Sequence, residues 1–122
     1  MSKEIKIVIA EDNSVLTLLL KLSLKKEGYQ LFIAEDGKAA KALIVEHNPH
    51  VILTDIMMDY FSGLELISYV RNELKRDTPI LVFSSSGQEE IILKAFSLGA
   101  TDFMSKPLMP NELVFRVKKM LL

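Results

Sequence analysis

Side chains capable of chemistry recur at one kind of place in this sequence, directly after short apolar runs. They are three carboxylates, two hydroxyls and one amine: Glu11, Asp12, Asp55, Ser84, Ser85 and Lys106. Three carboxylates around one ammonium leave an excess of about two negative charges, which repel one another unless a divalent cation lies among them. Oxygen ligands on loops that retain water suit Mg²⁺ or Mn²⁺. If these residues meet in space, they therefore predict a divalent-cation site.

The apolar runs predict five strands that alternate with five helices. The strands are expected at 5–10, 30–34, 51–54, 79–83 and 101–104. The helices are expected from a cap at 13 or 14 to about 27, from after 37 to about 48, and at about 63–74, 88–98 and 110–121. Continuous apolar runs indicate strands that are buried on both faces. Strict alternation with short connections implies right-handed crossovers and a parallel sheet with helices on both faces. The carboxyl ends of such strands share one edge, where the working site lies.

Several residues mark where these helices begin and end. Asn13 or Ser14 can cap the first helix, and Gly28 suits the left-handed position after its end. Pro49 disfavours helical geometry in the residue before it, and Pro110 suits the first turn of the last helix. The connection at 55–62 is predicted to be a loop.

Length and composition exclude several classes of protein. A chain of 122 residues is expected to form one domain, 1–122. With 15 Lys and Arg against 16 Asp and Glu, the net charge is -1, so no global field favours nucleic acid or an anionic membrane. The absence of Cys excludes a disulfide framework, a cysteine nucleophile and thiolate metal sites.

No segment resembles a targeting signal or a membrane span. The first six residues are polar and charged, and the leucine-rich segment 15–24 is far shorter than the roughly 20 apolar residues that a span needs. A cytoplasmic protein without membrane insertion is therefore expected.

The strand-end residues resemble, in order and spacing, the receiver domain of bacterial response regulators, the phosphoacceptor module of two-component signalling. The matching segments are Glu11-Asp12-Asn13, Asp55-Ile56-Met57-Met58 through Gly63, Ser84-Ser85, Gly99-Ala100-Thr101-Asp102-Phe103 and Lys106-Pro107. The resemblance extends over essentially the whole chain. It implies a flavodoxin-like α/β fold, a single doubly wound five-stranded parallel sheet in the order 2-1-3-4-5 with five helices.

The resemblance implies that Asp55 is the nucleophile. It would take a phosphoryl group from a phosphohistidine of a histidine kinase or histidine phosphotransfer domain. A carboxylate is already ionised at neutral pH and needs no general base. By the same resemblance, Mg²⁺, or Mn²⁺ in its place, is held by the side chains of Asp12 and Asp55 and by the Met57 carbonyl, and Glu11 acts through a water.

The remaining site residues receive roles from the resemblance as well. Lys106 pairs with one phosphoryl oxygen and the Ser84 hydroxyl with another, and backbone N–H groups near Met57 and Ser85 complete the cradle. Phe103 is the aromatic switch residue that swings inward when the Ser84 hydroxyl moves, although an aromatic at this position also suits a simple core role. The Lys106-Pro107 peptide bond is expected to be cis.

The chain departs from the family pattern at two places. Glu11 replaces an Asp but should still reach a water on the metal. Asp59-Tyr60-Phe61 replaces a segment that usually begins with Pro, so the loop should be less rigid, with Asp59 as a solvated loop residue. Apolar Met57 offers no group that activates water, so hydrolysis of the acyl phosphate should not be unusually fast.

Two apolar surfaces suggest partners. Leu18 and Leu22 widen the apolar arc of the first helix, which suggests a docking patch for the kinase or phosphotransfer domain. The segments 88–98, 101–104 and 110–121 form the family's output and dimerisation face, a candidate homodimer interface. His47 and His50 flank a turn at the amino end of the sheet and are predicted to be surface residues rather than metal ligands.

Three alternatives stay open at this point. A degenerate receiver would bind partners without phosphorylation, yet Asp12, Asp55, Ser84 and Lys106 are all present. An aspartyl phosphohydrolase of similar topology carries Asp-x-Asp after the first strand, where this chain has Glu11-Asp12-Asn13. A flavin-binding electron carrier needs donors in a turn that here is acidic. The leading hypothesis is a phosphorylation-switched module and not a turnover enzyme.

Overall fold

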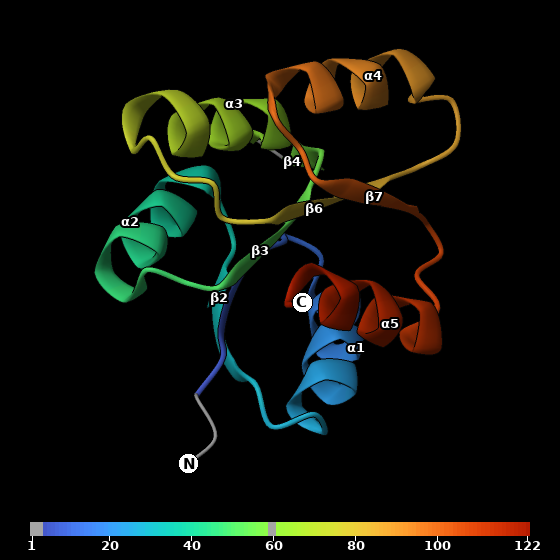
Figure 1. Ribbon diagram of the computed structural model, residues 1–122. Coiled ribbons are helices and arrows are strands. Elements are labelled where there is room, and N and C mark those ends of the chain that lie inside the picture. Colours follow the sequence, from blue (N-terminus) through green and yellow to red (C-terminus); the bar gives the residue numbers. More distant parts are fainter. Residues whose placement is uncertain (1–3, 59–60) are drawn as a thin grey trace.

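The centre of the computed structural model, which describes residues 4–58 and 61–122, is a five-stranded parallel sheet (Figure 1). Its strands are β1 (Lys6–Ala10), β2 (Gln30–Ala34), β3 (Val51–Asp55), β6 (Ile80–Ser84) and β7 (Asp102–Ser105). They lie in the order β2-β1-β3-β6-β7. Counted along the chain within this sheet, the order is 2-1-3-4-5, so the predicted doubly wound, flavodoxin-like fold is confirmed.

Helices cover both faces of the sheet. Helices α1 (Ser14–Lys25) and α5 (Pro110–Met120) lie on one face, and α2 (Gly37–His47), α3 (Gly63–Ser68) and α4 (Glu89–Leu98) lie on the other (Figure 1). The third predicted helix, 63–74, changes its geometry partway. A π-helical turn, η1 (Tyr69–Glu73), continues α3, and the Leu74 N–H donates to the Tyr69 carbonyl at 3.0 Å.

The central strands β1, β3 and β6 are mostly apolar because each one packs against helices on both sides. In β1, for example, Val8 contacts the core layer beneath α2, α3 and α4, whereas Ile7 contacts the layer beneath α1 and α5. Both side chains are fully buried. Alternate residues of one strand therefore belong to different core layers, which holds the strand ends at a common edge.

Side-chain caps start three helices directly after strands or loops that lead to that edge. The Asn13 side chain accepts a hydrogen bond from the Leu16 N–H at 3.0 Å, and Asp36 accepts one from Ala39 at 2.8 Å. Ser62 caps α3 by accepting from the Glu65 N–H at 3.2 Å. These local bonds fix where the chain turns from strand to helix.

The connection after Asp55 contains regular structure that the sequence did not indicate. Strands β4 (Met57–Met58) and β5 (Phe61–Ser62) form a short antiparallel pair within the predicted loop 55–62. The prediction for Asp59 falls outside the described residues.

Both histidines lie at the amino end of the sheet, as predicted, but they are only partly exposed. The His47 ring stacks on Phe32 with ring centroids 3.7 Å apart. The Nδ1 atom of His50 accepts a hydrogen bond from the Lys6 backbone N–H at 3.0 Å. Both residues keep part of their surface exposed, and each imidazole also has a packing or bonding role. His47 is the last residue of α2 and not part of the turn.

Candidate functional site

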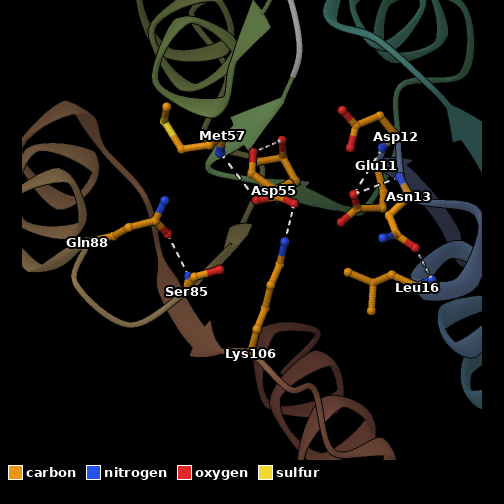
Figure 2. Close-up of polar contacts among 10 residues, drawn as sticks. Glu11, Asp12, Asn13, Leu16, Asp55, Met57, Ser85, Gln88 and Lys106 are labelled. Carbon is orange, nitrogen blue, oxygen red and sulfur yellow. Dashed lines mark hydrogen bonds and ion pairs between the residues drawn. The ribbon is translucent and has the colours of Figure 1, made fainter.

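Polar side chains from separate strand ends meet at the carboxyl edge of the sheet. Asp55 lies at the end of β3, with Glu11 and Asp12 on one side and Lys106 reaching toward it from another (Figure 2). Carboxylate oxygens of the three acids lie within 4.8 Å of one another. The two predicted side-chain ligands, Asp12 and Asp55, thus form one cluster with Glu11, the acid predicted to act through a water.

Asp55 is held by contacts to its side chain and its backbone. Its Oδ1 accepts a hydrogen bond from the Met57 N–H at 3.2 Å, and its Oδ2 is paired with the Lys106 ammonium (Figure 2). The Thr54 hydroxyl donates to the Asp55 carbonyl at 2.9 Å. Gly63 packs so close that a Cβ there would lie 2.5 Å from the same carbonyl oxygen. The carboxylate is 4% exposed and has a fixed orientation.

Glu11 is buried, with one carboxylate oxygen satisfied and the other not. Its Oε2 accepts from the Asp12 and Asn13 N–H groups at 3.0 and 3.1 Å, whereas Oε1 has no hydrogen-bond partner among residues 4–58 and 61–122. Burial, together with the negative charge of Asp55, raises the pKa of Glu11 from 4.5 to about 7. A cation at this point would offset the repulsion from Asp55 and favour the ionised form of Glu11.

The donor set fits a hard divalent cation. It consists of carboxylate oxygens, one of them an orphaned buried oxygen, with no nitrogen or sulfur ligand among the clustered acids. Mg²⁺ and Mn²⁺ prefer such ligands. The predicted backbone ligand, Met57, follows Asp55 by two residues and is itself 51% exposed.

Lys106 is anchored in the loop after β7. Its backbone N–H donates to the Ser84 carbonyl at 2.7 Å, and its side chain is 28% exposed. The Lys106-Pro107 bond is cis, as predicted. An ammonium that contacts Asp55 while keeping some exposure can also meet an incoming anion.

The two serines after β6 have different surroundings. Ser84 is 1% exposed, and its Oγ has no hydrogen-bond partner in the part of the chain that the structure describes. The Ser85 N–H, next to the predicted phosphoryl cradle, donates to the Gln88 side chain at 2.6 Å (Figure 2). Sequence reasoning missed this contact of Gln88, for which the sequence carries no specific signal.

Phe103, the predicted switch residue, lies in β7 and is partly buried. Its ring meets Phe96 of α4 edge to face, with centroids 6.0 Å apart and an interplanar angle of 89°. The ring therefore links β7 to α4, and this contact involves it in the face formed by α4, β7 and α5.

Exposed apolar side chains lie on α1 and α4. On α1, Leu18 and Leu22 are 55% and 58% exposed, and Val15, which the sequence reasoning did not single out, is 77% exposed. On α4, Leu93 and Phe96 are also exposed. Within the described residues, no helix is both long enough and apolar enough to cross a membrane.

Comparisons with known proteins agree with this architecture. The family model "Response regulator receiver domain" matches residues 7–118. The phosphate regulon transcriptional regulatory protein PhoB of Pseudomonas aeruginosa is 35% identical over 116 residues, which are 94% of this chain and 51% of PhoB. The chain thus spans about half the length of this curated relative.

Solved structures give the same result. The chemotaxis response regulator CheY4 of Vibrio cholerae superposes with a TM-score of 0.89 at 26% identity, covering 98% of this chain and 100% of CheY4. The receiver domain of NtrX from Brucella abortus superposes with a TM-score of 0.88 at 26% identity, covering 94% of this chain and 97% of that domain.

Proposed function

The chain belongs to the receiver-domain family of response regulators, and on this premise we propose that Asp55 accepts a phosphoryl group from a phosphohistidine and that this phosphorylation switches a partner-binding surface. Phosphoryl acceptance and Mg²⁺ binding are general properties of the family. One observation supports the assignment to Asp55 above the others: its carboxylate lies between the Met57 N–H, the Lys106 ammonium and the acidic pair Glu11 and Asp12.

The proposed step is a displacement at phosphorus. An Asp55 oxygen forms the new O–P bond as the N–P bond of the phosphohistidine breaks, and the departing imidazole nitrogen takes up a proton. Such transfers depend on position and charge neutralisation more than on proton transfer by the protein. A divalent cation held by Asp12, Asp55 and the Met57 carbonyl, with Glu11 acting through a water, would supply most of that neutralisation.

Lys106 would exchange partners during the step. In the unmodified chain its ammonium neutralises Asp55. As the carboxylate becomes an acyl phosphate, negative charge moves outward onto the phosphoryl oxygens, and the ammonium can follow on its flexible side chain. Lys106 would then pair with a phosphoryl oxygen as a point charge.

Ser84 and Phe103 would carry the change outward. The buried Ser84 hydroxyl has no partner in the described structure, so a phosphoryl oxygen would be its first strong acceptor. Movement of that hydroxyl would open space near β7, where Phe103 contacts Phe96. The state with Phe103 turned inward would then be favoured, in a shift between two existing conformations.

The finer points of the proposal concern partners and location. The donor would be a cytoplasmic histidine kinase or histidine phosphotransfer domain that docks on the exposed apolar part of α1. The face formed by α4, β7 and α5 would carry the output and would serve a homodimer. Because the acyl phosphate is the signal and no further substrate is turned over, the chain would act as a switch and not as an enzyme.

Phosphorylation with a small donor tests the proposal. The chain is incubated with acetyl phosphate or phosphoramidate and Mg²⁺, and intact mass is measured. We expect one phosphoryl adduct in the wild type and in the matched control Asp77→Asn, which alters an exposed aspartate, and no adduct in Asp55→Asn. An unmodified wild type would favour the degenerate receiver, and sustained phosphate release from many substrates would favour the phosphohydrolase.

A further inference from the structure

Phe61 packs onto the first turn of α2 in a space that only glycine leaves open. A Cβ built on Gly37 would lie 1.8 to 2.2 Å from three atoms of the Phe61 ring. Gly37 does not have a positive φ, so its backbone conformation does not require glycine. Since glycine weakens a helix relative to alanine, its presence here is explained by the ring that occupies the position.

Lys41 and Tyr69 complete the surroundings of this ring. Lys41 lies one helical turn after Gly37, and its ammonium is 5.1 Å from the Phe61 ring centroid and 4.7 Å from the Tyr69 ring centroid. Residues four apart share one face of a helix, and an ammonium over an aromatic face is attracted to it. Contacts with α2 thus hold the ring both at the helix start and one turn later.

Phe61 is also part of the loop structure that follows Asp55. Phe61 pairs with Met58, and Ser62 pairs with Met57, in the β4–β5 ladder. Next along the chain, the Gly63 N–H donates to the Ile56 carbonyl at 2.9 Å. A ladder with two residues in each strand is too short to be stable by itself, so it needs an anchor.

We propose that Phe61 is a positioning residue: its ring, held in the space over Gly37, anchors β4 and β5 and so holds the Met57 backbone against the Asp55 carboxylate. The inference rests on the function proposed above. It adds that α2, which contributes none of the clustered acids, helps to set the geometry of the acceptor loop. The Met57 N–H, which donates to Asp55 at 3.2 Å, is the group whose position depends on this anchor.

Hydrogen exchange in EDTA tests the anchor without metal and without phosphorylation. In Phe61→Ala, we expect the Met57 and Gly63 amides to exchange about tenfold faster or more, because the loop opens locally. Amides of the central strand β6 should keep their rates, and Phe61→Leu should restore most of the protection. The matched control is Phe115→Ala, which removes a ring that is 66% exposed on α5. Unchanged exchange of both loop amides in Phe61→Ala would overturn the inference.

A double-mutant cycle with Gly37 tests whether the ring itself carries the coupling. Gly37→Ala should displace the ring and accelerate exchange at Met57 and Gly63 much as Phe61→Ala does. In the Phe61→Ala background the same substitution should have no further effect, since the space is already empty. Equal, additive effects in both backgrounds would show that Gly37 and Phe61 act separately and would contradict the proposal.

The functional arm measures the Mg²⁺ dissociation constant and the rate and KM of phosphorylation by acetyl phosphate. Phe61→Ala should raise the Mg²⁺ dissociation constant about threefold to tenfold and lower the maximal rate, with Phe61→Leu close to the wild type. If wild type and Phe61→Ala are phosphorylated at equal rates and with equal Mg²⁺ dependence, the inference alone fails. If the wild type takes up no phosphoryl group at all, the proposed function fails, whereas the anchoring of the Met57 loop by Phe61 is still decided by hydrogen exchange in EDTA.

Discussion

Removing the Ser84 hydroxyl should make the unphosphorylated chain more stable toward unfolding. This Oγ is buried and has no hydrogen-bond partner in the described structure, and an unsatisfied buried hydroxyl costs about 1–3 kcal/mol. Ser84→Ala deletes that cost and leaves only a small gap. We expect the free energy of unfolding to rise by about 1 kcal/mol and the melting temperature by about 4 °C for a domain of this size.

The matched comparison is Thr54→Val, which removes a hydroxyl that is also fully buried but is bonded. Thr54 Oγ1 donates to the Asp55 carbonyl at 2.9 Å, so its loss should destabilise the chain by about 1 kcal/mol. Urea unfolding in EDTA, followed by circular dichroism, measures both variants. A Ser84→Ala chain that is less stable than the wild type would refute the reasoning, because it would mean that the hydroxyl makes a stabilising bond.

Three further predictions concern the rest of the site. In EDTA, the pKa of Glu11 is about 7 in the folded chain against 4.5 in the unfolded chain, so the folded state binds the proton more tightly. The free energy of unfolding should therefore fall as the pH rises from about 4.5 to about 7. Glu11→Gln should flatten this slope, and an equal slope in the wild type and the variant would contradict the assignment. Gly63→Ala places a Cβ 2.5 Å from the Asp55 carbonyl oxygen and 2.9 Å from the Ile56 Cα. Because backbone atoms cannot easily move away, urea unfolding should show that the free energy of unfolding falls by about 1–3 kcal/mol. A fall of less than about 0.5 kcal/mol would mean that the loop adapts to the added methyl group. Lys106→Gln removes the cation paired with Asp55. It should slow phosphoryl uptake from acetyl phosphate about a hundredfold in an intact-mass time course. A rate within about threefold of the wild type would exclude a direct role of Lys106 in phosphoryl transfer.

The order of elements and the identity of most site residues were predictable from the sequence. Buried strands need continuous apolar runs, and strict alternation with helices permits few topologies, so the sheet and its functional edge followed from local pattern. The acids at that edge were visible because each one directly follows a strand. Asp55 and Lys106 could be expected to meet for the same reason, and the structure pairs them.

Other features depend on contacts between distant segments and had no local signal. Whether Glu11 keeps one oxygen without a partner depends on how β1 and β3 bring its side chain beside Asp55. The space over Gly37 has meaning only once Phe61, 24 positions later in the sequence, lies in it. The sequence by itself thus determined which elements form and which chemical groups end them. Burial, charge proximity and ring packing are properties of three-dimensional neighbours, so the raised pKa of Glu11 and the anchoring of the acceptor loop arose only when the chain folded.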